Sequence, residues 1–414
     1  MTQAPTPPQP APFPRVFKVA IAIEVLERLA FYGVYINLQV YLVETVGLTV
    51  ASVGSMLAVF AIFRSWLPVV VGGFADRLGF RASLLIAFSC YTLAYGLLFA
   101  GPTLGLAYVA ILGMGIGGAF MKPVITGAVR RYSPEGRQTQ GFAIFYASVN
   151  AGSVIGKSTV YVLRRLLSLR TSLLVGVVGS VLALVTAALL FFEPADDDAR
   201  DARPREPLFA VVTGYAVALR NVKLTAFLVA VSGYYLLIEQ FYQTFPLYFA
   251  RLAPTLPREL VSLVNPLTIA LLQVGVARAS KRLDPLLAMT LGVLVGSVSM
   301  LAMGVAPGLG GAVASFFLFG VAEMIFSPRF YDFVGAFAPK GKEGLYMGLA
   351  LAPAGLGGFV GGKLSGALIE RFMPKGGAID ALSIWGTYAV IGVGCALVLF
   401  GYRATLGRGA QAPG

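Results

Sequence analysis

Long apolar segments recur along almost the whole chain, and they constrain its fold more than any other feature. Hydropathy and helix-breaking residues divide the sequence into about twelve of them, most about 20 residues long or longer. A segment of that length and polarity crosses a bilayer as a helix, because a helix satisfies its own backbone groups in lipid. Only 12% of the residues are charged, against about 25% in soluble domains. The chain is therefore predicted to be an all-α, multi-pass protein of the cell membrane, inner or plasma.

The expected spans form two sets of six. They cover residues 16–43, 50–75, 80–101, 104–131, 138–162, 171–192, 224–250, 257–278, 284–305, 309–334, 343–370 and 380–402. The one strongly polar break, Glu193 to Pro207, separates the sets as a linker would. We expect a disordered tail at 1–14, a six-helix half at 15–192, a cytoplasmic linker at 193–223, a second six-helix half at 224–403 and a tail at 404–414.

The basic residues give the orientation. The segments on the side of the N-terminus hold 19 Lys and Arg, and the opposite segments hold seven. Cytoplasmic loops carry this excess, so both termini are expected in the cytoplasm. The same excess of basic loop residues accounts for the formal net charge of +13. We therefore expect the protein to lie in the lipid bilayer and to bind no nucleic acid.

Three ionisable residues interrupt the first span. Glu24, Glu27 and Arg28 lie in the run Ile23-Glu-Val-Leu-Glu-Arg-Leu-Ala-Phe-Tyr-Gly33, and spacings of three and four place them on one helix face. Charges at membrane depth are costly, by about 2.5–3.5 kcal/mol on insertion scales, and they mark proton or substrate pathways. This face is predicted to be a proton or substrate site.

The absence of histidine limits the chemistry. With no His in the sequence, a proton carried near neutral pH must be bound by a carboxylate. No Cys/His metal set, hydrolytic triad or P-loop is present, so we expect no enzyme activity, metal or cofactor, with a proton gradient as the driving force.

The loop after the second span resembles a motif of the major facilitator superfamily, whose layout of twelve helices in two halves the spans also match. The motif residues are Gly72, Asp76, Arg77, Gly79 and Arg81. The resemblance implies the major facilitator fold, with substrate bound at mid-membrane between the halves.

Six further motifs, in the expected order, resemble the proton-coupled oligopeptide transporters, the peptide/nitrate branch of that superfamily. They are Glu24-x-x-Glu-Arg with its Tyr-Gly, Lys122-Pro123, Phe145 to Ser153, Glu239-Gln240, Asn265-Pro266, and Glu323 with Ser327-Pro328. The chain is identified as a divergent member of this family.

The resemblance implies proton symport of di- or tripeptides or a similar zwitterionic solute by alternating access. Glu24, Glu27 and Arg28 would couple protons; Lys122, Glu239 and Glu323 would form gates between the halves. The expected substrate-binding residues are Tyr32, Tyr35, Arg64, Lys122, Tyr146, Asn150, Asn265 and Glu323. We expect a monomer whose partners are protons and a small-molecule substrate.

Departures from the family pattern keep alternatives open. Tyr35 stands where peptide-transporting members have a base, and Arg64, near mid-membrane, is the hypothetical replacement. The eleventh span, Gly344 to Gly362, has no Trp. The alternatives are proton-coupled transport of a non-peptide solute (nitrate, a modified amino acid or a metabolite), efflux, or a non-transporting sensor. Lys157, two turns beyond Asn150, is expected to snorkel to the outer interface.

Overall fold

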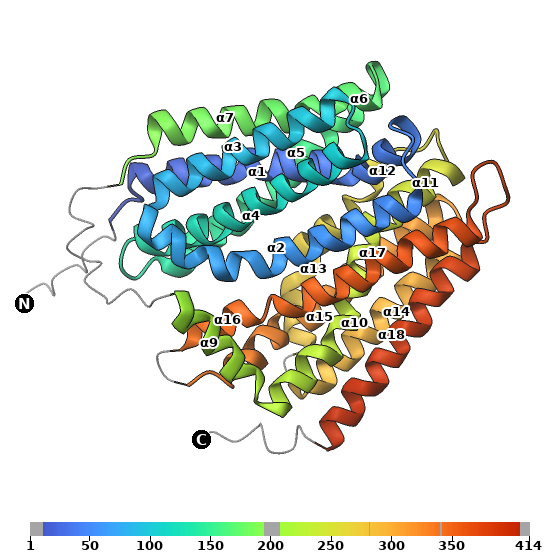
Figure 1. Cartoon of the computed structure of the whole chain (residues 1–414). Coiled ribbons are helices and arrows are strands. Elements are labelled where there is room, and N and C mark those ends of the chain that lie inside the picture. The colour runs from blue at the N-terminus through green and yellow to red at the C-terminus, as the bar shows by residue number, and fades with distance from the viewer. Residues whose placement is uncertain (1–10, 194–207, 281, 340–341, 406–414) are drawn as a thin grey trace, which may run out of the picture.

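The computed structural model describes residues 11–193, 208–280, 282–339 and 342–405, and this part of the chain is helical without strands (Figure 1). The helices of the N-terminal half are α1 (Arg15–Val40), η1 (Tyr41–Thr45), α2 (Val50–Leu78), α3 (Phe80–Ala100), α4 (Leu104–Tyr132), α5 (Gln138–Leu166), α6 (Leu169–Ser172) and α7 (Leu174–Leu190). After α9 (Leu208–Leu219) come α10 (Val222–Gln243), α11 (Phe245–Leu252), α12 (Arg258–Val261), α13 (Val264–Ser280), α14 (Pro285–Val305), α15 (Leu309–Gly335), α16 (Glu343–Leu349), α17 (Ala352–Phe372) and α18 (Ala381–Ala404).

Ten stretches in the described residues are long and apolar enough to cross a membrane. Two further long helices, α1 and α5, bring the total to the predicted twelve. They are less apolar than the other ten because they carry more charged and polar residues. Several predicted spans consist of two consecutive helices, such as α10 with α11 and α12 with α13. The multi-pass, all-α fold expected from the sequence is confirmed.

The helices gather into two bundles, α1 to α7 (blue to green) and α10 to α18 (yellow-green to red), which lie side by side in Figure 1. Helix α9 lies within the predicted linker 193–223, whose residues 194–207 are outside the described part. The same holds for residues 1–10 and 406–414 of the predicted tails.

Glycines bring the helices of the two bundles into close contact. A Cβ on Gly54 of α2 would lie 2.5 Å from the carbonyl oxygen of Gly362 in α17, and one on Gly362 would lie 2.7 Å from the amide nitrogen of Ala58. Within the first bundle, a Cβ on Gly156 of α5 would lie 2.2 Å from the carbonyl oxygen of Leu29 in α1. Small residues permit such backbone contact between membrane helices, where lipid provides no hydrophobic force for association.

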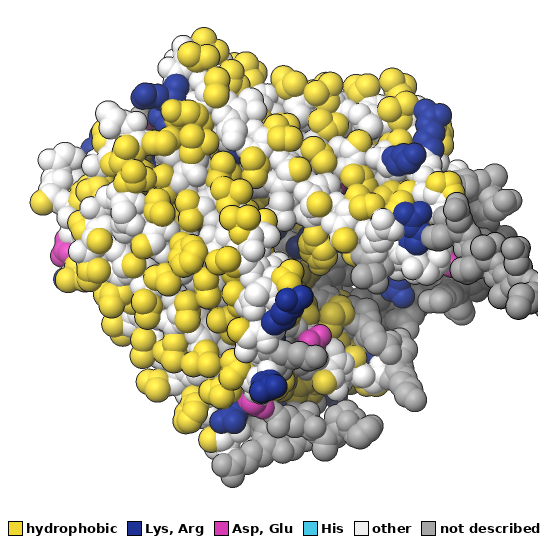
Figure 2. Space-filling model, turned by 180° about the vertical axis from the view of Figure 1, so that it is seen from behind, with side chains coloured by type: hydrophobic (Ala, Val, Ile, Leu, Met, Phe, Trp, Pro, Cys, Tyr) yellow, Lys and Arg dark blue, Asp and Glu magenta, His cyan; other side chains and the backbone are white. Residues whose placement is uncertain are grey.

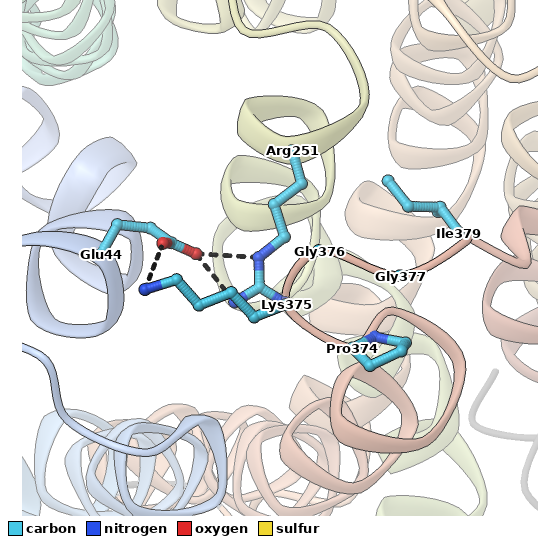
Figure 3. Close-up of a pocket in the computed structure, with 7 residues that line it drawn as sticks. All are labelled: Glu44, Arg251, Pro374, Lys375, Gly376, Gly377 and Ile379. Atoms are coloured by element: carbon cyan, nitrogen blue, oxygen red, sulfur yellow. Dashed lines mark hydrogen bonds and ion pairs between the residues drawn. The ribbon is translucent and has the colours of Figure 1, made fainter.

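Ion pairs join the bundles at the end where η1, α11 and the α17–α18 loop lie, which the basic-residue count assigns to the extracellular side. Arg251 Nε donates to Glu44 Oε1 at 2.8 Å, and Lys375 Nζ lies 3.8 Å from Glu44 Oε2 (Figure 3). These residues line a cavity of about 290 Å³ together with Pro374, Gly376, Gly377 and Ile379. The molecule is therefore held together at this end.

The surface itself is mostly apolar, as expected for a protein surrounded by lipid. Figure 2 shows hydrophobic side chains over most of one face and, near its middle, a hollow with basic side chains in and beside it. Some polar side chains in the middle of helices, including Lys122 and Asn150, are exposed. Because a charge that faces lipid at that depth is costly, we infer that the exposed Lys122 faces a water-accessible space.

Candidate functional site

The three charged residues of α1 form one buried cluster. Arg28 Nε lies 2.7 Å from Glu24 Oε1 and 2.8 Å from Glu27 Oε2, so a single guanidinium serves two carboxylates. Only 1% of Glu24 and 2% of Glu27 is exposed. The i, i+4 spacing brings Glu24 and Arg28 together, as the sequence predicts, while Glu27 reaches the same nitrogen from the adjacent position.

Tyr91 of α3 completes the cluster, and sequence reasoning missed it. Its hydroxyl donates to Glu27 Oε1 at 2.9 Å. Room for this ring comes from α4, where a Cβ on Gly118 would lie 2.9 Å from the Tyr91 hydroxyl and one on Gly117 would lie 3.0 Å from the ring. The glycine-rich run of α4 thus packs against α3 and sets the position of the side chain that hydrogen-bonds Glu27.

Lys122 and Glu323 come from opposite bundles, α4 and α15, and no ion pair joins them in the described residues. Glu323 accepts one long hydrogen bond, 3.5 Å, from Asn265 Nδ2 of α13, while the Lys122 side chain is exposed. The ion pair predicted between these residues is therefore not formed in this conformation, and their gating role stays a prediction. Glu323 is instead hydrogen-bonded to Asn265 of its own bundle.

The predicted Arg64–Glu239 contact is present between the bundles. Arg64 Nη2 of α2 pairs with Glu239 Oε1 of α10, and the Tyr35 hydroxyl donates to Glu239 Oε2 at 3.3 Å. Glu239 is 5% exposed, whereas 30% of the Arg64 side chain is accessible. Arg64 therefore supplies the positive charge for Glu239 that the sequence lacks at Tyr35.

The remaining predicted substrate residues differ in their exposure. Tyr146 is 64% exposed and Asn150 is also exposed, with Asn150 Nδ2 donating to the Tyr146 carbonyl at 3.1 Å. Tyr32 is half-buried against Tyr242 of α10, with ring centroids 6.2 Å apart. Asn150 has no partner in the opposite bundle among the described residues, so its amide oxygen remains available to a solute.

Lys157 does not snorkel, and that prediction is wrong. It is 2% exposed, and its Nζ lies 5.5 Å from the ring centroids of both Tyr32 and Tyr242. The reason lies one residue earlier, since Gly156 packs on α1 and turns this part of α5 toward the protein interior. The sequence did contain a signal for this direction, because the seven-residue spacing from Asn150 places both side chains on the same face of α5.

The superfamily motif is described only in part. Gly72, Asp76 and Arg77 lie near the end of α2, and the side-chain contacts of the two charged residues lie outside the described structure. Gly79, with φ of +82°, makes the turn into α3 in a backbone region that favours glycine. Arg81 Nη2 donates to the Ala188 carbonyl at 2.7 Å, so this part of the motif ties α3 to α7 within one bundle.

A second buried network, at the extracellular end, has no signal in the sequence. Glu259 of α12 is fully buried and accepts from Arg164 Nε at 2.6 Å, Arg164 Nη2 at 3.0 Å and Asn37 Nδ2 at 2.9 Å. Arg258 Nε donates to Asn37 Oδ1 at 2.8 Å. Since Asn37 lies in α1 and Arg164 in α5, the network fastens α12 to the opposite bundle.

Comparison with known proteins places the chain in a family. The sequence profile described as Major Facilitator Superfamily matches residues 21–362, which include the α1 cluster, the Arg64–Glu239 pair and Lys122. The chain belongs to this superfamily. The protein is accordingly a multi-pass membrane protein of the major facilitator fold.

Curated relatives are distant members of the superfamily. An uncharacterised transporter of Mycobacterium tuberculosis is 26% identical over 55% of this chain, which spans about half, 52%, of that protein. The multidrug resistance protein MdtH of Cronobacter sakazakii is 22% identical over 90% of both chains. Dipeptide and tripeptide permease A of Salmonella typhi is 24% identical over 42% of this chain and 36% of its own length.

Solved structures share the fold over almost the whole chain. A POT family transporter in complex with a thioalcohol-conjugated peptide has a TM-score of 0.78 at 17% identity, covering 95% of this chain and 97% of its own. The nucleoside transporter NupG has a TM-score of 0.79 at 15% identity, covering 94% and 98%. The fold implied by the sequence resemblance is therefore confirmed, and superfamily members with different named substrates share it.

Proposed function

We propose that this protein is a proton symporter for a small zwitterionic solute, with di- and tripeptides as the first candidates. The observation that carries the proposal is the buried pair of carboxylates, Glu24 and Glu27, which share Arg28 Nε at 2.7 and 2.8 Å. Protonating either carboxylate removes one ion pair and changes the charge of the cluster by one. In a chain without histidine, these are the groups suited to carry the proton.

The arrangement of Lys122 and Glu323 supports a zwitterionic cargo. One lies in each bundle, neither has an ion-pair partner in the described residues, and they differ in sign. A solute with an ammonium and a carboxylate can satisfy both groups at once, and binding it favours approach of the bundles. The sequence resemblance to peptide transporters and the relative named as a dipeptide and tripeptide permease agree with this substrate class.

Tyr35 favours a second candidate, a proton-coupled carrier of a non-peptide solute. Tyr35 occupies the position of the family's base, and Arg64 is engaged by Glu239, so two groups that could bind a peptide carboxylate are lost. Export is included in this alternative, because the same carboxylates can couple transport in either direction and one relative is named as a multidrug resistance protein.

The test is solute accumulation in proteoliposomes under an imposed proton gradient, comparing dipeptides, tripeptides, amino acids, nitrate and nucleosides. We expect accumulation of peptides with entry of protons, and loss of accumulation in Glu24→Gln and Glu27→Gln with exchange of solute retained. Glu370→Gln, which alters an exposed carboxylate of α17, is the matched control. Peptide transport without acidification, or unchanged accumulation in both cluster variants, would reject proton coupling through this site.

A further inference from the structure

Lys157 is a buried lysine without an anionic partner among the described residues. Its Nζ lies 5.5 Å from the ring centroids of both Tyr32 and Tyr242, and the side chain is 2% exposed. Among the described residues it has no hydrogen bond or ion pair. Aromatic faces attract an ammonium, yet a buried charge without a counter-ion is unfavourable, so this site is suited to an anionic group.

The rings that cover Lys157 belong to different bundles. Tyr32 lies in α1 and Tyr242 in α10, and Tyr242 stacks on Tyr35 with centroids 5.2 Å apart. The carboxylate of this aromatic cluster, Glu239, is already held by Arg64 and Tyr35. Lys157 therefore lies at the junction of the bundles, and no acidic side chain of the cluster is available to it.

Alternating access would change which side chains pack over Lys157. If the bundles rock apart at the extracellular end, Tyr242 moves away with the second bundle while Lys157 and Tyr32 stay together in the first. The ammonium is then open toward the extracellular side.

The charges without partners indicate the kind of solute. Lys122, Lys157 and Glu323 have no ion-pair partner among the described residues, whereas Arg28 and Arg64 are engaged by carboxylates and Lys363 donates to the Ser55 hydroxyl. The complement of this set is a solute with two acidic groups and one ammonium. On the basis of the proposed function, we propose that Lys157 binds a second carboxylate of the solute in the outward-open state, so that the transporter prefers acidic amino acids or acidic peptides to neutral ones.

The test compares two dipeptides of nearly equal shape, Ala-Glu and Ala-Gln, offered together to proteoliposomes under a proton gradient. We expect the wild type to take up Ala-Glu about tenfold better, since a hydrogen bond to a charged group contributes about that factor. Lys157→Met, which keeps the volume and is compatible with an apolar site, should bring the ratio near one, and Lys157→Arg should retain the preference. An unchanged ratio in Lys157→Met, or no preference in the wild type, would overturn the proposal.

A binding measurement separates this proposal from the proposed peptide transport. If the wild type transports neither dipeptide, the peptide function fails, and the anion site is then tested by thermal unfolding of the purified protein with L-glutamate or L-glutamine. A ligand that binds the folded state raises the melting temperature by mass action. Stabilisation by glutamate alone in the wild type and Lys157→Arg, lost in Lys157→Met, supports the site. Equal shifts with both ligands, no shift with either, or a glutamate shift that survives Lys157→Met, refutes it.

Discussion

Arg164 of α5 holds the fully buried carboxylate of Glu259 in α12 through two hydrogen bonds, of 2.6 and 3.0 Å. The two residues are 95 positions apart and belong to different bundles. A two-point contact fixes the relative orientation of the helices as well as their distance. This pair therefore joins the bundles at the extracellular end in the conformation observed, and the proposed alternating access would require that it break.

Arg164→Ala should destabilise this conformation strongly. Arg164→Ala leaves the buried Glu259 with Arg258, whose Nη2 lies 3.8 Å away, as its remaining ion-pair partner, and removing one partner of a buried pair typically costs about 3–5 kcal/mol. We expect a lower melting temperature of the detergent-purified protein and greater labelling from outside of a cysteine introduced near Tyr242. The double variant Arg164→Ala/Glu259→Gln should be less destabilised than Arg164→Ala, because both charges are gone.

The control for this prediction is Lys375→Ala at the same end of the molecule. The Lys375 side chain is 78% exposed and its Nζ lies 3.8 Å from Glu44 Oε2. Exposed pairs contribute about 0–1 kcal/mol, so stability and labelling should be close to wild type. Equal losses in Lys375→Ala and Arg164→Ala would show that burial of the Arg164–Glu259 pair is not what closes this end.

Gly156→Ala should disrupt the contact between α5 and α1. The added methyl group would lie 2.2 Å from the carbonyl oxygen of Leu29, so the helices must separate next to Arg28 and the proposed coupling site. We expect lower thermal stability and reduced proton-driven uptake. Gly105→Ala in α4, where nothing lies within 4 Å of the added carbon, is the control and should behave like the wild type. A Gly156→Ala protein with normal stability would show that this contact is not close in the membrane.

The membrane fold could be predicted from the sequence because each span carries its own signal, a long apolar run. The Glu24–Arg28 contact could be predicted for the same reason, since both residues lie within one turn of one helix. Tyr91 and Glu259 could not, because their partners lie 64 and 95 residues or more away and only tertiary packing brings them together.

Lys157 shows a different limit of sequence reasoning. Hydropathy reports the depth of a residue in the membrane, and it does not report whether the side chain faces lipid or protein. The close approach of Gly156 to Leu29 decides that question for this turn of α5. The same holds for Arg64, whose side chain faces the protein because it pairs with Glu239 of the opposite bundle.

Arg64→Ala should impair transport more than the loss of an ordinary surface charge. It leaves the buried Glu239 with only the Tyr35 hydroxyl as a hydrogen-bond donor to its carboxylate in the described residues. We expect proton-driven uptake to fall at least about tenfold, and Arg64→Lys to recover part of it, because the charge is kept without the planar guanidinium.

Lys363→Met is the matched control for Arg64→Ala. Lys363 Nζ also spans the bundles, donating to Ser55 Oγ at 2.8 Å, yet its loss leaves only a neutral hydroxyl behind. Uptake measured in the same vesicles should change less than about twofold. Normal uptake by a well-expressed Arg64→Ala variant would exclude a role for the Arg64–Glu239 pair in transport.

Tyr91→Phe and Tyr95→Phe form a matched pair that tests the coupling cluster. The two rings of α3 stack with centroids 5.6 Å apart, but only the Tyr91 hydroxyl reaches Glu27, at 2.9 Å, while the buried Tyr95 hydroxyl lacks a partner among the described residues. A hydrogen bond to a charged group contributes about 1.5–3 kcal/mol, whereas removing a buried hydroxyl without a partner is neutral or stabilising. We therefore expect Tyr91→Phe to alter the pH profile of proton-driven uptake and to reduce accumulation about tenfold.

Tyr95→Phe should keep the wild-type profile and accumulation, with an equal or higher melting temperature. The measurement is initial uptake at a series of external pH values in proteoliposomes, with solute exchange in the absence of a gradient as the reference for correct folding. Because the variants differ only in which of two adjacent hydroxyls is missing, a general effect on α3 would alter both profiles alike. Equal changes in both variants would indicate that Tyr91 acts through packing. A change confined to Tyr91→Phe would indicate that the Tyr91 hydroxyl acts on the protonation of Glu27.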